Sequence, residues 1–287
     1  MNNLESVEIN IVINDNCIEC GKCVEVCPLG ILTYKTINPV LKRPVIFDPR
    51  ACICCGHCTA VCSKDAISHN QLPLDEFKKI DSSYSIGWKD FVKFTRQKRS
   101  IRKFLDRQIP EEIIDKILDE STRYAPTGHN RQSTDIIIIK GKKLKEIKEE
   151  LNKAVELLYY LLNILHFFSK NLEYHWRYVR SCRHMIELGM DPYTRYAPMA
   201  LLFTSDKCIK ESEVDAAILS YQTVISAELL GLKSCYFGAL INSLPYSKKL
   251  RNLISLPAHK KITCGILLGY SDVKYNKEIY RKKLNRL

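Results

Sequence analysis

A cysteine spacing that occurs twice near the start of the chain constrains its fold more than any other feature. The first run, C-x2-C-x2-C-x3-C followed by proline, comprises Cys17, Cys20, Cys23 and Cys27. The second run, 35 residues later, comprises Cys52, Cys55, Cys58 and Cys62. Three thiolates at this pitch can wrap one face of an iron-sulfur cubane, while the fourth points away and serves the other cluster. The pattern therefore predicts two [4Fe-4S] clusters, one held by Cys17, Cys20, Cys23 and Cys62, and the other by Cys52, Cys55, Cys58 and Cys27.

Zinc and disulfides are the alternative uses of so many cysteines. Structural zinc is disfavoured because a tetrahedral site takes its ligands in two pairs, not in two runs of four at one pitch. Disulfides are typical of secreted domains, whereas the opening residues MNNLESVEIN lack the basic and apolar stretches of a secretion signal. We therefore expect a cytoplasmic protein. The surplus cysteines are predicted to be buried apolar residues: Cys54, Cys182, Cys208, Cys235 and Cys264.

The chain is predicted to contain two domains. Residues 1–72 form a small domain of two similar halves, each with a strand, a cysteine loop, a short helix and a second strand. Gly21 and Gly56 follow a ligand in each half, where a residue without a side chain lets the backbone bend. Residues 73–90 are polar, contain Pro, Ser and Gly, and are predicted to be a linker. Residues 91–287 form the second domain.

The second domain is predicted to be an α+β sandwich, with helices around a central, mainly antiparallel sheet. Pro110 and two acidic residues begin a helix, and a second helix over residues 215–230 stops at Gly231. Residues 142–190 are expected to be helical without strands. Short apolar runs predict buried strands at residues 135–140, 199–204 and 264–269.

The basic charge of the chain lies entirely in its later part. Residues 1–70 contain 6 Lys and Arg against 7 Asp and Glu, which leaves 38 and 25 of the totals of 44 and 32 for the remainder. No nucleic-acid partner is expected, because the Lys and Arg are scattered without a recognised binding motif. No membrane partner is expected either, because the longest apolar run, 154–168, is shorter than the roughly 20 residues that cross a bilayer.

Residues 8–70, with all eight ligands, resemble bacterial two-cluster ferredoxins, which transfer single electrons. A flavin is the usual acceptor that joins one-electron to two-electron chemistry. The cations around Ser100 suit a phosphate, and residues 125–132 form a turn rich in hydrogen-bonding groups. Together with Tyr236-Phe237-Gly238 and the tail 269–284, these segments resemble the nitroreductase family of FMN flavoproteins. The resemblance covers about residues 90–287, with a helical insertion at about 150–195.

This resemblance implies roles for particular residues. The FMN phosphate would be bound by Lys98, Arg99, Ser100 and Arg102, with Arg281 and Lys283 closing the phosphate site. The isoalloxazine would be contacted across a homodimer interface by Pro126, Thr127, Gly128, Asn130 and Gln132. The backbone of Phe237 and Gly238 would lie at flavin N5.

The chain is therefore expected to be an iron-sulfur flavoprotein oxidoreductase. Electrons would pass from the two clusters to FMN and on to a nitroaromatic, a quinone or a similar small electrophile. NAD(P)H and external reduced ferredoxin are both candidate donors, and no glycine-rich dinucleotide fingerprint follows a strand. The alternative is a redox sensor or a pure electron carrier without substrate turnover of its own.

Overall fold

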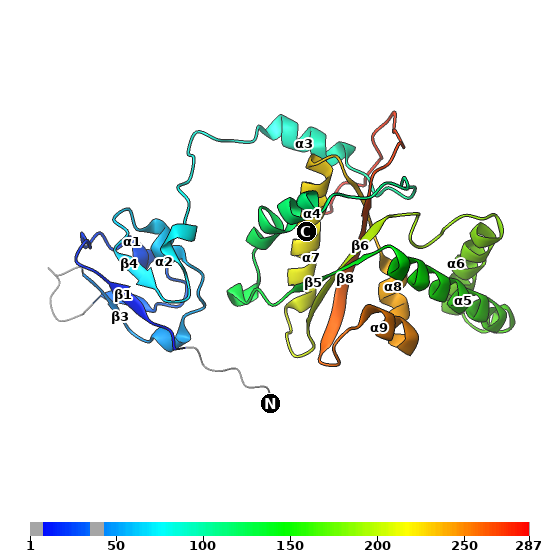
Figure 1. Ribbon diagram of the computed structural model, residues 1–287, viewed down its shortest axis with the longest axis horizontal. Helices are drawn as coiled ribbons and strands as arrows, with labels where there is room; N and C mark the ends of the chain where they lie inside the picture. The colour runs from blue at the N-terminus through cyan, green and yellow to red at the C-terminus, as the bar shows by residue number, and fades with distance from the viewer. Residues whose placement is uncertain (1–7, 35–42, 287) are drawn as a thin grey trace. The chain divides into compact units, whose positions relative to one another are not determined.

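The computed structural model describes residues 8–34 and 43–286, and it divides into two compact units (Figure 1). The first contains the chain up to Ser85 together with His129–Arg131, and the second contains Ile86–Gly128 and the chain from Gln132 onward. The division at Ser85 falls within the segment 73–90 that the sequence predicts to be a linker. The connection between the two cysteine runs, Pro39 to Pro44, lies largely outside the described residues. Within the described ranges, no helix is long and apolar enough to cross a membrane.

The first unit has the duplicated order that the sequence predicts. Its first half runs through β1 (Ile11–Ile13), α1 (Lys22–Glu25) and β2 (Leu32–Tyr34). Its second half runs through β3 (Pro44–Ile46), α2 (His57–Val61) and β4 (Ile67–His69). The halves interlock, because β1 pairs with β4 and β2 pairs with β3, both antiparallel. Gly21 (φ 74°) and Gly56 (φ 73°) precede the two helices in the left-handed conformation that favours glycine.

The second unit is built on a four-stranded sheet in the order β5-β6-β8-β7. The strands are β5 (Asp135–Lys140), β6 (Met199–Asp206), β7 (Lys233–Tyr236) and β8 (Lys260–Gly269). Every pairing in this sheet is antiparallel, which confirms the predicted sheet type. Alternate residues of β6 enter opposite cores, Ala200 and Leu202 on one face and Leu201 and Phe203 on the other. The sheet is therefore covered on both faces.

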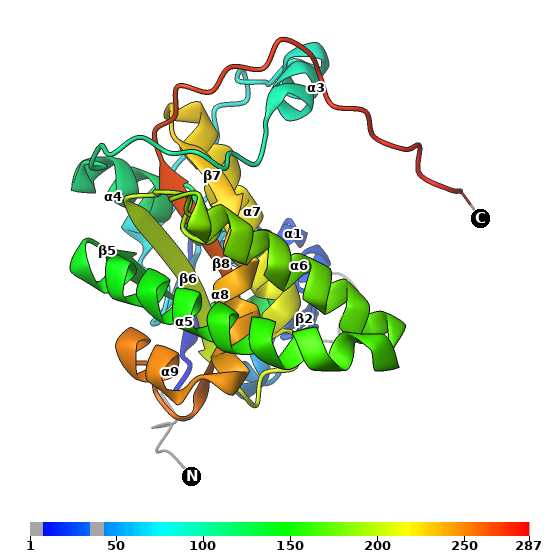
Figure 2. The ribbon, with the colours of Figure 1, turned by 90° about the vertical axis from the view of Figure 1, so that its right-hand side faces the viewer.

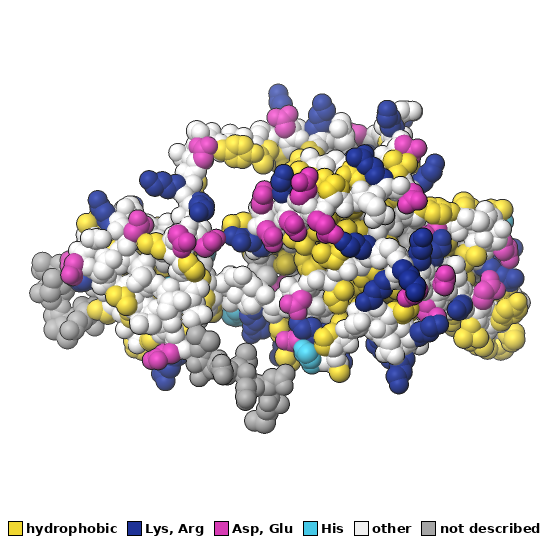
Figure 3. Space-filling model, in the orientation of Figure 1, with side chains coloured by type: hydrophobic (Ala, Val, Ile, Leu, Met, Phe, Trp, Pro, Cys, Tyr) yellow, Lys and Arg dark blue, Asp and Glu magenta, His cyan; other side chains and the backbone are white. Residues whose placement is uncertain are grey.

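Helices form a layer on each side of this sheet (Figure 2). One face packs against α5 (Lys142–Leu165), α6 (Lys170–Glu187), α8 (Gly238–Ser243) and α9 (Lys248–Ile254). The other face packs against α4 (Glu111–Asp119) and α7 (Ser212–Leu229). These layers confirm the predicted α+β sandwich. The helices expected at 142–190 are the hairpin of α5 and α6. The turn of this hairpin exposes apolar side chains, including Ile164, Phe167 and Phe168, and Figure 3 shows hydrophobic side chains gathered at the right-hand end of the molecule.

Three local features differ from the expectations. Helix α3 (Trp88–Gln97) begins inside the segment predicted to be linker, and none of its residues is buried. Strand β7 was not predicted, because its four residues, KSCY, contain neither a long apolar run nor strict alternation. The prediction that Cys208 is buried was wrong, since Cys208 lies exposed in the turn between β6 and α7. Cys182 is buried, while Cys54, Cys235 and Cys264 are partly buried.

Candidate functional site

The eight cysteines of the two runs surround two small cavities. One cavity is lined by the thiols of Cys17, Cys20, Cys23 and Cys62, with apolar walls that include Ile13 and Ile67. The other is lined by the thiols of Cys27, Cys52, Cys55 and Cys58, with walls that include Ile11 and Ile31. Each set takes three cysteines from one run and the fourth from the other run. Four thiols around an apolar space suit the ligand requirement of a [4Fe-4S] cluster.

Backbone N–H groups donate to the crossing cysteine of each set at the same relative position. The N–H of Ile31 lies 3.2 Å from Cys27 Sγ, and the N–H of Ala66 lies 3.3 Å from Cys62 Sγ. Burial raises the pKa of the Cys27 thiol, but the backbone groups from Leu29 to Leu32 outweigh it, and the pKa lies below its usual range. Burial is the main cause that raises the pKa values of Cys23 and Cys58, and neighbouring thiols add to it. The donors at Cys27 stabilise its thiolate form, which is the form that can bind a metal.

In the second unit, residues 98–102 run beside strand β7. Ser100 and Ser234 form a parallel bridge, and the Ile101 N–H donates to the Ser234 carbonyl oxygen at 2.9 Å. In an extended segment, alternate side chains face opposite sides. Ile101 is buried, so the segment has one side toward the core and one toward solvent. Lys98, Ser100 and Arg102 therefore share a side, and Arg99 lies on the opposite side with Ile101.

Three cations converge on Cys235 in strand β7. Burial raises the pKa of the Cys235 thiol, and the positive charges of Arg102, Arg195 and Lys98 oppose that rise. Burial also lowers the pKa of Lys98, whose ammonium lies 5.9 Å from the centre of the Tyr221 ring. In the part of the chain that the structure describes, none of the three cations has an ion-pair partner. Lys98 is half-buried and Arg102 is exposed, and the carboxylate of Glu228 acts on Lys98 without forming an ion pair with it. Clustered cations that form no ion pairs are suited to bind an anion such as a phosphate.

The sequence did not indicate Arg195 as a site residue. Its position is set by the buried carboxylate of Asp191, four residues earlier. Asp191 accepts backbone N–H groups from Tyr193 (3.1 Å), Thr194 (3.0 Å) and Tyr196 (3.2 Å), and it also accepts the Thr194 hydroxyl. Lys148 pairs with the same carboxylate at 3.3 Å. Arg195 (φ 57°) and Tyr196 (φ 64°) both adopt the left-handed conformation. Such strain in non-glycine residues persists only where surrounding bonds impose it.

Replacing Asp191 with alanine is expected to destabilise the second unit by about 3 kcal/mol or more, because several buried donors and Lys148 lose their acceptor. Burial raises the pKa of Asp191, but its hydrogen bonds and Lys148 outweigh burial and hold it below the ordinary value of 3.8. The stabilisation is thus complete above that value and is lost as the pH falls toward the lower folded pKa. Urea unfolding at several pH values measures both effects. The exposed Asp115→Ala is the control, and equal unfolding midpoints for the two variants would contradict the assignment.

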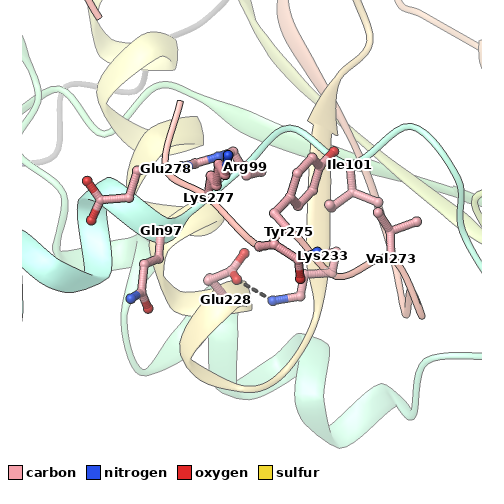
Figure 4. A pocket seen from close by; sticks show the side chains of 10 residues that line it. Gln97, Arg99, Ile101, Glu228, Lys233, Val273, Tyr275, Lys277 and Glu278 are labelled. Atoms are coloured by element: carbon pink, nitrogen blue, oxygen red, sulfur yellow. Dashed lines mark hydrogen bonds and ion pairs between the residues drawn. The ribbon is translucent and has the colours of Figure 1, made fainter. Parts of the chain in front are cut away.

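Arg99 lines a separate pocket with residues 273–278 of the C-terminal segment (Figure 4). Its guanidinium donates to the carbonyl oxygens of Arg96 and Lys98. Two acidic side chains also line this pocket, Glu228, which pairs with Lys233, and Glu278, which pairs with Arg96. This pocket is therefore less suited to a phosphate than the group formed by Lys98, Arg102 and Arg195.

The predicted flavin turn has a strained backbone. His129 (φ 54°), Asn130 (φ 52°) and Gln132 (φ 46°) are left-handed around the short helix Gly128–Asn130. The Gly128 N–H donates to Asp215 Oδ1 at 2.8 Å, and the Gln132 N–H donates to Thr127 Oγ1 at 3.1 Å, while Pro126 is exposed. Within the first unit, the Asn130 side-chain amide donates to the carbonyl oxygens of Ile53 (3.2 Å) and Cys54 (2.8 Å).

The remaining predicted flavin residues lie at the end of β7 and in the C-terminal segment. Phe237 is buried and its N–H donates to the Gly265 carbonyl oxygen at 2.8 Å. Gly238 begins α8 at an exposed position, where an added Cβ would meet nothing within 4 Å. Arg281 and Lys283 are exposed in the segment that follows β8. Their role in phosphate binding stays a prediction, as do the roles of the turn residues.

Comparison with protein families gives two matches that together cover most of the chain. Residues 95–270 match the nitroreductase family, and residues 16–66 match a 4Fe-4S dicluster domain. The second match spans both cysteine runs. The two matches lie in the two units that the structure separates.

Known proteins match this chain at low identity. A candidate NADH dehydrogenase/NAD(P)H nitroreductase of Methanothermobacter thermautotrophicus is 25% identical over 63% of this chain and 77% of its own length. A 4-nitrobenzoate reductase of a Nocardioides species is 22% identical over 64% of this chain and 82% of its own length. The crystal structure of a nitroreductase with bound FMN from Desulfitobacterium hafniense covers 71% of this chain and all of that one, at 19% identity and a TM-score of 0.52. This likeness shows the shared fold.

Proposed function

Because this chain belongs to the nitroreductase family and also carries a 4Fe-4S dicluster domain, it is an iron-sulfur flavin oxidoreductase, and we propose that it reduces a small electrophile with electrons from two [4Fe-4S] clusters. The clusters supply one-electron steps, and FMN supplies the exchange between one-electron and two-electron chemistry. The observation that carries the proposal is the sorting of eight thiols into two sets of four, on the same chain as the group of cations formed by Lys98, Arg102 and Arg195.

The chain's own residues have separable tasks in this proposal. Cys17, Cys20, Cys23 and Cys62 hold one cluster, and Cys27, Cys52, Cys55 and Cys58 hold the other. Lys98, Arg102 and Arg195 bind the FMN phosphate, and Ser100 adds a hydroxyl on the same side of the segment. Gly238, two residues after the end of β7, is exposed and offers an open backbone where the isoalloxazine can approach.

The acceptor is proposed to be a nitroaromatic, a quinone or a similar electrophile. The similar protein from Nocardioides is a 4-nitrobenzoate reductase, which supports an aromatic nitro group as one accepted substrate. The similar protein from Methanothermobacter supports NAD(P)H as a donor, and the dicluster domain supports reduced ferredoxin as a second donor.

The first test is anaerobic purification of the full chain, followed by iron, sulfide and flavin analysis. Two clusters require about eight irons and eight sulfides per chain, with one FMN. FMN reduction by NADH, NADPH and reduced ferredoxin is then compared, with a nitroaromatic as acceptor. Zinc in place of iron, or a protein that takes up no flavin, would refute the proposal. Reduction of FMN without turnover of any acceptor would favour the electron carrier instead.

We also propose that the chain forms a homodimer through helix α7. An apolar stripe at helical spacing, Val214, Ile218, Tyr221 and Leu229, lies exposed along this helix, with exposed fractions between 37% and 70%. An exposed stripe of this kind on a helix of a folded unit is typical of a protein–protein contact. A second copy of the same helix is the partner that this surface would fit.

Replacing Ile218 with glutamate is expected to convert the dimer into monomer, because two buried carboxylates would face each other near the centre of the stripe. Sedimentation velocity measures the change. The control is Glu173→Gln on α6, which also alters one charge on an exposed helix. A monomeric wild-type holoprotein, or an Ile218→Glu variant that remains dimeric, would contradict the proposed interface.

A further inference from the structure

His69 is a buried histidine whose ring lies against a cysteine of the second cluster cavity. It ends strand β4, pairs across the sheet with Ile11, and is 6% exposed. Its Nε2 lies 3.6 Å from Cys52 Sγ, and both residues line the same cavity. His69 is neither a cluster ligand nor a flavin-binding residue in the proposed function.

The hydrogen bonds of the ring determine which nitrogen carries the proton. Nδ1 accepts the backbone N–H of Gln71 at 3.0 Å, so Nδ1 has no hydrogen in this arrangement. The single ring proton is therefore on Nε2 and points toward Cys52 Sγ. The sulfur also accepts the Cys54 N–H at 3.4 Å, so Cys52 has two donors.

The two halves of the first unit are not equivalent at this position. The residue 35 positions before His69 is Tyr34, which corresponds to it in the duplication. Tyr34 is 39% exposed and its hydroxyl lies against Gly21, so the first half has a phenol in place of the imidazole. A hydrogen bond to a cluster sulfur stabilises the reduced cluster, because reduction adds negative charge that the donor offsets.

We propose that His69 donates a hydrogen bond from Nε2 to the Cys52 sulfur and raises the reduction potential of its cluster above that of the cluster held by Cys17, Cys20, Cys23 and Cys62. His69 is a positioning residue, because it acts through a ligand. With both clusters bound, a single added electron would reside mainly on the cluster beside His69. The inference rests on the two-cluster part of the proposed function and is independent of FMN.

The test compares the His69→Phe, His69→Gln and Tyr34→Phe variants of the full chain, purified anaerobically and titrated with dithionite while EPR follows each cluster. His69→Phe is expected to lower the reduction potential of one cluster. The equilibrium constant for its one-electron reduction should fall about tenfold, which corresponds to about 59 mV. His69→Gln retains an N–H donor near the same place, so its potential should lie closer to that of the wild type. Tyr34→Phe is the control and should leave the potential of the His69 cluster unchanged.

The inference would be overturned if the cluster that includes Cys52 had the same reduction potential in the wild type and in an iron-replete His69→Phe variant. If phenylalanine prevents cluster assembly, His69→Gln and His69→Asn decide, because glutamine reaches the Nε2 position and asparagine is shorter. If the cluster beside residue 69 has a higher reduction potential in His69→Gln than in His69→Asn, the inference is supported. Equal reduction potentials in these two variants overturn it. Fewer than about eight irons in the wild type would instead refute the two-cluster assignment itself.

Discussion

Replacing Cys62 with alanine is expected to remove the cluster that the first cysteine run otherwise holds, leaving about four of eight irons per chain. Cys62 belongs to the second run in sequence, but its thiol lines the cavity of Cys17, Cys20 and Cys23. A cubane with three thiolate ligands has one iron exposed, and that cluster is expected to be lost during purification. Iron and sulfide analysis of the anaerobically purified protein measures the loss, and EPR shows which signal remains.

Double variants test the crossed arrangement directly, because ligands of one cluster act as a unit. Cys62→Ala combined with Cys17→Ala should lose no more iron than Cys62→Ala alone. Cys62→Ala combined with Cys52→Ala should lose both clusters. Cys54→Ala is the matched control, since Cys54 lies in the same loop but does not line either cavity, and it should retain about eight irons. If each cluster were held by the four cysteines of one run, the variant with Cys62→Ala and Cys17→Ala would lose both clusters. The variant with Cys62→Ala and Cys52→Ala would lose only one.

The cysteine sets could be read from the sequence because their chemistry is local. Three ligands of each set lie within seven consecutive residues, so the spacing alone restricts the metal group that they can bind. The duplication then indicates that the fourth cysteine of each run, Cys27 or Cys62, is a ligand in the set of the other run. The long helices and the three apolar strands were predictable for a similar reason, since their periodicity lies in adjacent residues.

The anion site was only partly predictable, because it is assembled from distant segments. The sequence shows the cations at residues 98–102, but not that Arg99 lies on the other side from Lys98 and Arg102. That separation depends on the pairing of Ser100 with Ser234, and strand β7 has too weak a pattern to predict. Arg195 lies more than 90 positions from Arg102. Its only local signal is Asp191 followed three residues later by Thr194, a pair that typically forms a side-chain-capped turn.

Replacing Arg102 or Arg195 with alanine is expected to weaken FMN binding about 10-fold to 100-fold, because each loses a charge-assisted contact with the phosphate worth about 1.5–3 kcal/mol. Riboflavin has the same isoalloxazine without the phosphate, so its affinity should change little. Equilibrium dialysis of the flavin-free, iron-replete protein against each flavin measures both constants. The ratio of the FMN and riboflavin affinities isolates the phosphate contribution from any general loosening of the fold.

Arg99→Ala is the matched control for that ratio, since it removes the same type of charge from a neighbouring residue on the opposite side of the segment. The structure favours a small effect for Arg99, whereas the family resemblance alone assigns it to the phosphate. A large loss of FMN affinity at Arg99, with none at Arg102 and Arg195, would move the phosphate to the pocket beside residues 273–278. Equal losses for FMN and riboflavin would instead show that the two cations do not contact the phosphate. Comparing the two flavins across the three arginine variants therefore distinguishes the two candidate phosphate sites, the group of Lys98, Arg102 and Arg195 and the pocket beside Arg99.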